Sequence, residues 1–131
     1  MYMLDTDICI YIIKRKPKSA LKRLESLQPE QLALSAITFA ELMNGAKKSR
    51  QVEANVAKLN ELAELIEIRP FDQKAAVFYG DVRSTLEKKG NIIGSNDLLI
   101  AAHALSLDWI LVTNNEKEFK RVDGLRIENW V

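Results

Sequence analysis

The sequence has few of the residues that build disulfides, zinc sites or histidine-based catalysis. Cys9 is the only cysteine and His103 the only histidine among 131 residues. One cysteine cannot form an intramolecular disulfide, and together these two residues cannot supply a Cys-rich or multi-His zinc site. A Ser-His-Asp relay is conceivable, but a nuclease that uses a pair of histidines is excluded. Any catalysis must rely mainly on carboxylates, and the cysteine content fits a reducing, cytoplasmic setting.

Long apolar runs and an excess of one charge are also missing. The longest apolar run near the start extends only from Ile8 to Ile13, whereas a helix that spans a bilayer needs about 18 such residues. We therefore expect neither a signal peptide nor a membrane span. A net charge of +1 excludes a polybasic tail or an acidic disordered region as the whole chain. Without linkers or repeats, a chain that is 47% hydrophobic predicts one domain over residues 1–131.

Short apolar segments alternate with segments of helical periodicity. The apolar segments predict strands at 2–4, 32–34, 65–68, 109–112 and 125–127. Apolar residues three or four positions apart predict helices at 19–27, 38–48, 52–64, 72–89 and 97–107. Strands separated by helices favour a parallel sheet, because a parallel pair needs a crossover connection. The expected fold is α/β, a three-layer α/β/α sandwich around a mainly parallel sheet of four or five strands.

Local signals suggest where two of these helices begin. Thr38 stands three residues before Glu41, which predicts a capping box, and Asn96 is predicted to cap the last helix. Gly45 lies inside the second helix, where glycine costs about 1 kcal/mol relative to alanine. We expect the close approach of another segment to explain it. His103 is expected to be a buried, hydrogen-bonded histidine.

Acidic and amide side chains occur at the ends of strands and the starts of helices. Asp5 follows strand 2–4, Glu41 lies in the helix after strand 32–34, and Asp97 opens the most apolar helix. Open parallel sheets form their binding crevice beyond the carboxyl ends of the strands. The three acids have apolar neighbours, where a carboxylate is costly unless it is paired or metal-bound. Each also has a structural explanation, as a loop cap, a capping-box acid or a first-turn acid.

Carboxylates gathered in one crevice would repel each other and raise their pKa values. A divalent cation relieves that repulsion. Oxygen ligands without a second histidine or cysteine favour Mg²⁺ or Mn²⁺ over zinc or copper. Such an ion characteristically acts on phosphates, because it polarises a phosphoryl oxygen and lowers the pKa of an attacking water. The acids therefore predict metal-assisted phosphoryl chemistry.

Four blocks of sequence stand in order along the chain: MLDTDICIYI (3–12), ITFAELMNG (37–45), IGSNDLLIAAHA (93–104) and LVTNNEKEFKRV (111–122). In order and spacing they resemble the signature blocks of PIN-domain ribonucleases, and more narrowly those of VapC-type toxins from bacterial toxin–antitoxin modules. The resemblance covers essentially the whole chain. It implies a PIN-like fold and a metal-dependent endoribonuclease.

The resemblance also implies roles for individual residues. Asp5, Glu41 and Asp97 match the acids that hold the metal and water, and Asn115 matches a fourth catalytic position where family members have Asp or Asn. Three more residues match accessory positions, namely Thr6, Asp7 and Glu118. Thr6 matches a hydroxyl that often supports the first aspartate. Asp7 stands where Asn is common, and it either adds to the site or caps the following helix.

The partners that the resemblance implies are RNA and protein. Structured RNA is the implied substrate, with the anticodon stem-loop of initiator tRNA as the leading candidate. A cognate antitoxin would block the crevice, commonly with a basic side chain among the acids. A toxin homodimer and a higher hetero-oligomer with the antitoxin are also expected.

Basic residues follow the first two blocks. Lys14, Arg15, Lys16 and Lys18 come after the first, and Lys47 and Lys48 after the second. Such clusters suit a phosphate backbone, although a solvated helix face has the same composition. We expect these six side chains to bind RNA.

Two other functions fit parts of the sequence. Asp5-Thr6-Asp7 after an apolar strand is similar to the D-x-D block of haloacid-dehalogenase-type phosphatases, in which Asp5 would be the nucleophile. Cys9 stands where threonine or valine is expected there, and no late acidic block follows a strand. The other alternative is a non-catalytic RNA- or partner-binding domain, against which the three retained acids argue. The favoured hypothesis is in-line hydrolysis of RNA by an activated water, leaving 5′-phosphate and 3′-hydroxyl ends.

Overall fold

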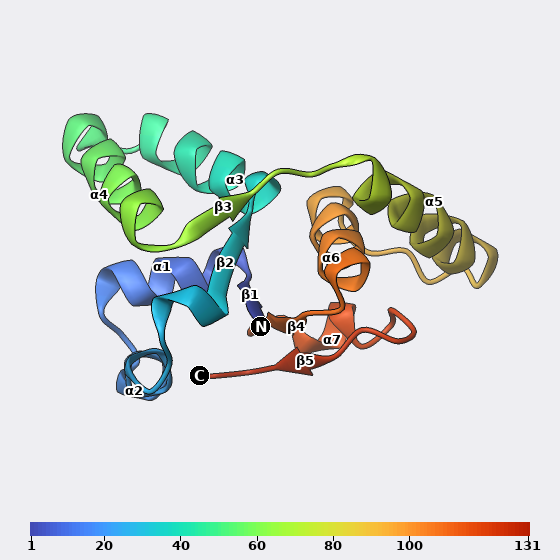
Figure 1. Ribbon diagram of the computed structural model, residues 1–131. Coiled ribbons are helices and arrows are strands. Elements are labelled where there is room, and N and C mark those ends of the chain that lie inside the picture. The colour runs from blue at the N-terminus through green and yellow to red at the C-terminus, as the bar shows by residue number, and fades with distance from the viewer.

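The computed structural model describes residues 1–131, and its centre is a five-stranded sheet (Figure 1). The strands are β1 (Tyr2–Leu4), β2 (Leu32–Ser35), β3 (Glu67–Arg69), β4 (Ile110–Val112) and β5 (Ile127–Glu128). They lie in the order β3-β2-β1-β4-β5, and every neighbouring pair is parallel. The predicted α/β class and parallel sheet are confirmed, and the sheet has five strands.

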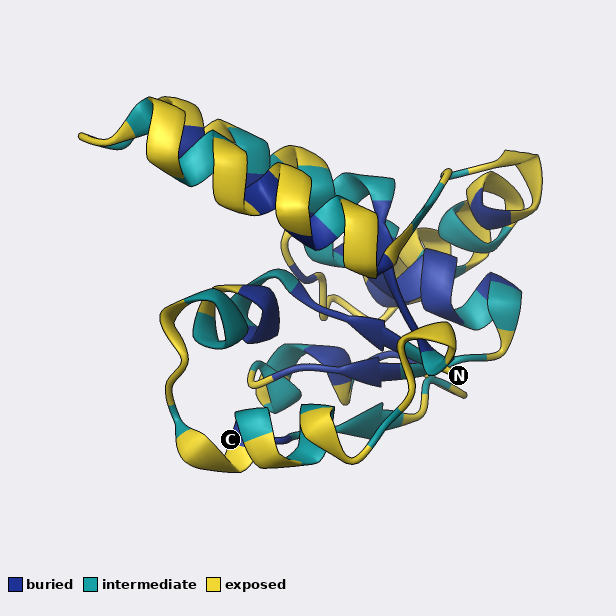
Figure 2. Cartoon of the chain, turned by 60° about the vertical axis from the view of Figure 1, so that its left-hand side comes forward, coloured by how far each residue is buried: buried dark blue, intermediate teal, exposed yellow.

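Helices cover both faces of the sheet, so that its central strands β1, β2 and β4 are mostly buried (Figure 2). The helices are α1 (Thr6–Lys14), α2 (Lys18–Glu25), α3 (Ala36–Lys47), α4 (Val52–Leu65), α5 (Gln73–Lys88), α6 (Ser95–Leu107) and α7 (Glu116–Phe119). Successive side chains of a strand point to opposite faces. Accordingly, Leu4 and Val112 belong to one core, with residues of α1 to α4, and Met3 and Leu111 to a second, with residues of α5 to α7. The result is the expected three-layer sandwich. None of the helices has the length and hydrophobicity that a membrane crossing requires.

The five predicted helices are all present, but two helices were not delimited from the sequence. Helix α1 contains the apolar run from Ile8 to Ile13, whose β-branched residues have no clear helical period. It forms because the chain must cross from β1 to the parallel β2, and because the Asp5 carboxylate accepts a hydrogen bond from the Thr6 backbone N–H at 2.7 Å. Helix α7 is a single short turn after β4.

Two predicted helix caps are wrong, by three residues for α3 and by two residues for α6. Helix α3 is capped by Ser35, whose Oγ accepts from the Ile37 backbone N–H, so Thr38 is buried inside the helix and forms no capping box. Helix α6 follows Gly94, which leaves the Asn96 side chain free of any capping role. A Cβ built on Gly45 would meet no atom within 4 Å outside its own helix, so the expected close approach there is also wrong.

The single histidine is structural, as predicted. His103 is 1% exposed, and its Nδ1 lies 2.8 Å from the Ser35 Oγ. The Phe71 ring packs edge-on against it at 5.4 Å between centroids. Burial lowers the pKa of His103, which keeps the neutral imidazole in the core.

Helix α2 is attached to the central strand β1 and to the C-terminal segment through one arginine. The Arg23 guanidinium lies 5.5 Å from the centre of the Tyr2 ring and 5.6 Å from that of Trp130. It also donates to the Tyr2 hydroxyl and forms an ion pair with Glu128 at 3.6 Å. This basic side chain is engaged in the fold, in contrast to the exposed lysines that precede it.

Candidate active site

The acidic residues meet where the strand order reverses. From β1 the chain first fills one side of the sheet with β2 and β3, and then the other side with β4 and β5, so β1 and β4 flank the switch point. Loops beyond the carboxyl ends of two such strands diverge and leave a crevice. Asp5 follows β1 and Thr113 follows β4 at this crevice, and the Asp5 backbone N–H donates to the Val112 carbonyl at 2.8 Å.

Asp5 is a buried carboxylate, 4% exposed, with both oxygens engaged. Its Oδ1 accepts from the Thr6 backbone N–H, and its Oδ2 accepts from the Thr113 hydroxyl at 2.7 Å. Burial raises the pKa of Asp5 to about 6, and repulsion from Asp7 and Glu41 adds to the rise while the hydrogen bonds oppose it. Sequence reasoning missed Thr113, although its place directly after the strand beside β1 was a usable signal.

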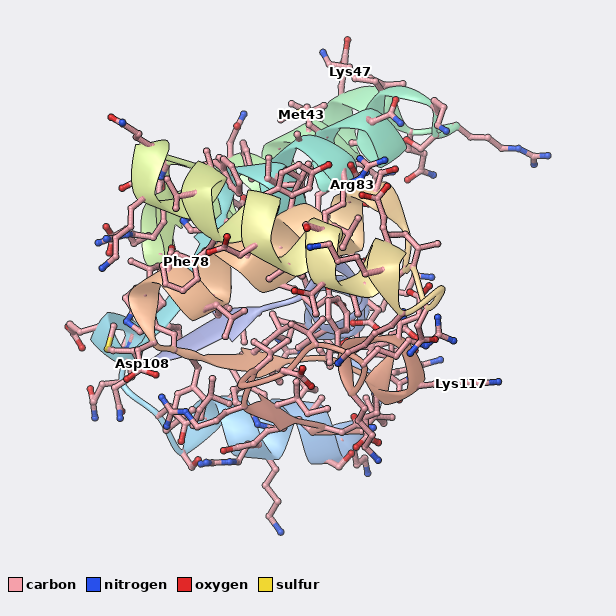
Figure 3. All side chains as sticks on the ribbon, turned by 90° about the vertical axis from the view of Figure 1, so that its right-hand side faces the viewer. Met43, Lys47, Phe78, Arg83, Asp108 and Lys117 are labelled. Carbon is pink, nitrogen blue, oxygen red and sulfur yellow. The ribbon has the colours of Figure 1, made fainter.

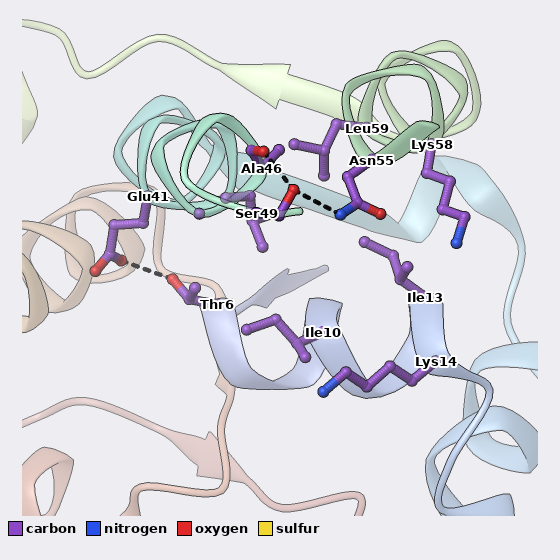
Figure 4. A pocket seen from close by; sticks show the side chains of 12 residues that line it. Thr6, Ile10, Ile13, Lys14, Glu41, Ala46, Ser49, Asn55, Lys58 and Leu59 are labelled. Carbon is purple, nitrogen blue, oxygen red and sulfur yellow. Dashed lines mark hydrogen bonds between the residues drawn. The ribbon is translucent and has the colours of Figure 1, made fainter. Parts of the chain in front are cut away.

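Glu41 reaches the crevice from α3 and is held from two sides. Its Oε1 accepts from the Thr6 hydroxyl at 2.7 Å, and its Oε2 accepts from the Asn96 amide at 3.1 Å (Figure 4 shows the first contact). The prediction that the Thr6 hydroxyl supports Asp5 is therefore wrong. The Thr6 backbone N–H serves Asp5, and its hydroxyl serves Glu41.

Asp97 belongs to a second acidic pair on the far side of the crevice. The Asn115 amide donates to Asp97 Oδ2 at 3.4 Å and to Glu118 Oε2 at 2.7 Å, and the Asn115 backbone N–H is fixed by Thr113 Oγ1 at 2.9 Å. Burial, a hydrogen bond with Glu118 and the negative charges of Asp5, Glu118 and Glu41 raise the pKa of Asp97 to about 8. The same hydrogen bond lowers the pKa of Glu118, so the pair holds its proton on Asp97.

Asp7 lies on the flank of this arrangement. It is in the first turn of α1, and its Oδ2 accepts from the Asn114 backbone N–H at 3.2 Å, which joins α1 to the loop after β4. Its Oδ1 is buried without a hydrogen-bond partner, and burial raises its pKa. The N-cap of α1 is Asp5, so Asp7 does not cap the helix, and its charge reaches the site through repulsion of Asp5.

The acids fit a divalent cation in their chemistry. No group of three or more Asp, Glu, His and Cys side chains is already arranged to hold an ion, because hydroxyl and amide donors bridge the carboxylates instead. The donor set nevertheless consists of oxygens, which hard cations prefer. The raised pKa values of Asp5 and Asp97 arise from burial and mutual repulsion, which a bound positive charge would offset.

Two cavities adjoin Glu41. The α1/α3/α4 groove has a volume of about 380 Å³, with Thr6 and Glu41 at one end and Lys14 and Lys58 on its sides (Figure 4). The α3/α6 hollow has a volume of about 340 Å³ and is lined by Ile37, Ala40, Glu41, Asn44, Asn96 and Leu99. The Glu41 carboxylate is thus part of the wall of both.

The predicted RNA-binding side chains are all exposed and form no ion pairs. Lys14 lies in the α1/α3/α4 groove, and Arg15, Lys16 and Lys18 follow it around the end of α1 and the start of α2. Lys47 extends into solvent from the end of α3 (Figure 3), and Lys48 follows it. Lys58, on α4, also lines the groove and was not predicted.

Comparisons with known proteins agree with this geometry. The PIN domain family matches residues 2–125. The chain is 48% identical to Ribonuclease VapC2 of Rickettsia felis over 131 residues, covering 99% of this chain and 98% of the relative. It is 42% identical to the tRNA(fMet)-specific endonuclease VapC of Shigella flexneri, covering 98% and 97%. Its fold matches the crystal structure of VapBC2 from Rickettsia felis bound to a promoter DNA fragment, with a TM-score of 0.92, 47% identity and coverage of 99% and 98%.

Proposed function

Because the chain belongs to the PIN-domain family and within it to the VapC ribonuclease toxins, we propose that it hydrolyses an RNA phosphodiester at the site formed by Asp5, Glu41 and Asp97. One observation carries this proposal. Three acids from distant parts of the sequence lie at the switch point of a parallel sheet, joined through Thr6, Asn96, Thr113 and Asn115. That architecture concentrates negative charge where a phosphate ligand would enter.

Mg²⁺ or Mn²⁺ is the proposed cofactor, with Asp5, Glu41 and Asp97 as its ligands. When bound, the ion supplies charge stabilisation at the phosphoryl oxygen and lowers the pKa of water. The Asn115 amide orients Asp97 through its contact at 3.4 Å, and Glu118 holds that amide by accepting from it at 2.7 Å. The raised pKa of Asp97 in the metal-free chain is one that a bound cation would lower, which suits this carboxylate to be a ligand.

The proposed reaction is in-line attack of water on phosphorus. The bond between phosphorus and the 3′ oxygen breaks, and the products carry a 5′-phosphate and a 3′-hydroxyl. No 2′-hydroxyl takes part. The alternative in which Asp5 attacks phosphorus is disfavoured, since both of its oxygens accept hydrogen bonds in a buried position.

The proposed substrate is initiator tRNA, cut in its anticodon stem-loop. The relative from Shigella flexneri, 42% identical over nearly the full length of both chains, bears the name tRNA(fMet)-specific endonuclease. The exposed Lys14, Arg15, Lys16 and Lys18 on one side of Glu41, with Lys47 and Lys48 beyond α3, supply contacts for phosphates around a folded RNA.

The proposed protein partner is a VapB-type antitoxin that blocks the crevice. Similar chains were solved as VapBC complexes from Rickettsia felis and Salmonella typhimurium, both bound to DNA. A homodimer of the toxin and a larger complex with the antitoxin complete the proposed assembly.

The decisive experiment is incubation of the purified chain with initiator tRNA and with an elongator tRNA, in Mg²⁺ or in EDTA, followed by mapping of both product ends. We expect cleavage of initiator tRNA in Mg²⁺ alone, with 5′-phosphate and 3′-hydroxyl ends. A 2′,3′-cyclic phosphate product or full cleavage in EDTA would refute the mechanism. Equal cleavage of both tRNAs would refute the substrate but not the chemistry.

A further inference from the structure

We propose that Asn96 is a positioning residue of this ribonuclease, which fixes the Glu41 carboxylate through the hydrogen bond from Asn96 Nδ2 to Glu41 Oε2 at 3.1 Å. This inference rests on the proposed function, because it gives Asn96 a role at the site that Glu41 serves. Asn96 touches neither substrate nor reacting atoms in this role. It acts through Glu41.

Glu41 needs such a contact because its side chain is long and only half-buried. A glutamate with several rotatable bonds adopts many rotamers unless its head group is held. The Thr6 hydroxyl holds one oxygen from α1, and Asn96 holds the other from α6. Neither contact alone would fix the plane of the carboxylate, whereas two donors on different oxygens do.

A purely structural role does not account for the Asn96 contact. Asn96 is exposed, and it does not cap α6, because Gly94 occupies the cap position and no side chain accepts a hydrogen bond there. A hydrogen bond between exposed groups adds little to folding stability, since water replaces it readily. The effect of the Asn96 hydrogen bond is instead to restrict the conformation of the Glu41 side chain.

The position of Asn96 also couples two of the proposed ligands. Adjacent residues of a helix point about 100° apart, so the first turn of α6 directs Asn96 toward α3 and Asp97 toward Asn115. The Glu41 carboxylate is thereby held in place by the same helical turn that carries Asp97. Because an amide is neutral, it orders Glu41 without cancelling the negative charge that a cation requires, as a lysine or arginine in its place would.

The test compares Asn96→Ala with Asn44→Ala. Asn44 is an exposed amide that lines the same α3/α6 hollow but forms no side-chain hydrogen bond, so it is a matched control. Mn²⁺ affinity is measured by isothermal titration calorimetry, and kcat and KM are measured on the RNA substrate. We expect Asn96→Ala to weaken Mn²⁺ binding by about 10-fold to 100-fold, the usual effect of losing an outer-shell partner. We expect kcat to fall, with KM and Tm unchanged and with Asn44→Ala like the parent.

Three results would overturn the inference. Asn96→Ala that binds Mn²⁺ as tightly as the parent would show that Glu41 does not depend on it. A rise in KM at unchanged Mn²⁺ affinity would mean that Asn96 contacts RNA instead. An equal loss in Asn44→Ala would point to a general effect of the hollow. If the parent chain itself neither bound Mn²⁺ nor cleaved RNA, the proposed function would fail, and the inference with it.

Discussion

At the scale of single residues, the site is a set of acids whose ionised forms reduce the stability of the metal-free fold. Asp5 and Asp97 have raised pKa values, of about 6 and about 8, because burial and neighbouring negative charges disfavour their ionised forms. In the unfolded chain both titrate near 3.8. Between these values the folded protein binds more protons than the unfolded chain, so stability falls as pH rises.

The metal-free protein should therefore be more stable at pH 6 than at pH 8.5. The difference reflects Asp97, because up to about pH 8 the folded chain keeps a proton that the unfolded chain has already lost, so stability falls as pH rises toward 8. We expect a Tm higher by at least about 3 °C at pH 6, measured by calorimetry in EDTA. Added Mg²⁺ should reduce the difference. A Tm that increases from pH 6 to pH 8.5 would contradict the assigned shifts.

The variant Asp97→Asn separates the effect of the Asp97 charge on stability from its effect on cleavage. The amide removes the charge, so the variant should melt above the parent at pH 8.5 in EDTA and lose most of the pH dependence. Cleavage should fall by more than about 100-fold, since a direct ligand matters at least as much as an outer-shell partner. Full cleavage by Asp97→Asn, measured on the same RNA with matched Mg²⁺, would remove Asp97 from the site.

At the scale of elements, sequence periodicity located the helices better than their ends. The spacing of apolar residues predicted α2 to α6, whereas α1 was obscured by its β-branched run. Thr38 and Asn96 do not cap these helices, because the caps are Ser35 and Gly94, three and two residues earlier. Asp5 and Glu41 were predicted from their places after strands, and Asp97 from its place at the start of the most apolar helix. Their bridging donors were not, since Thr113 and Asn96 act across distances that only the fold creates.

Gly45 offers a direct test of local stability in α3. A methyl group there meets no atom within 4 Å outside the helix, so Gly45→Ala should stabilise the protein. The gain in helix propensity is about 1 kcal/mol, which corresponds to about 3 °C in Tm for a domain of this size. Gly124→Ala is the matched control with the opposite sign, because its φ of 81° strains any side chain. A lower Tm for Gly45→Ala would mean that the groove beside it is packed in solution.

At the scale of the whole molecule, the near-neutral net charge conceals a separation of charge. The acids lie at the switch point, and exposed basic side chains lie on α1, α2, α3 and α4, of which Lys14 and Lys58 line the groove that ends at Glu41. The sequence predicted the clusters of basic residues. It did not predict that Lys58 lines the groove, because α4 approaches α1 only in the folded chain.

Electrostatic contacts with RNA should appear in the salt dependence of binding. In an Asp97→Asn background, replacement of Lys14 and Lys16 by alanine should reduce the slope of log K against log salt by about 1.4 to 1.8, which corresponds to two lost phosphate contacts. Replacement of Lys74 and Lys88, exposed on α5 away from the groove, should leave the slope unchanged. Equal slopes for both pairs, measured by filter binding, would show that the basic residues near α1 are only solvated.

Because Glu41 lines both cavities, an inhibitor could reach this residue of the enzyme from either one. A molecule bound in the α1/α3/α4 groove would lie beside the contact of Glu41 with Thr6, and one bound in the α3/α6 hollow would lie beside its contact with Asn96. Either occupant would therefore disturb one of the two contacts that hold the Glu41 carboxylate.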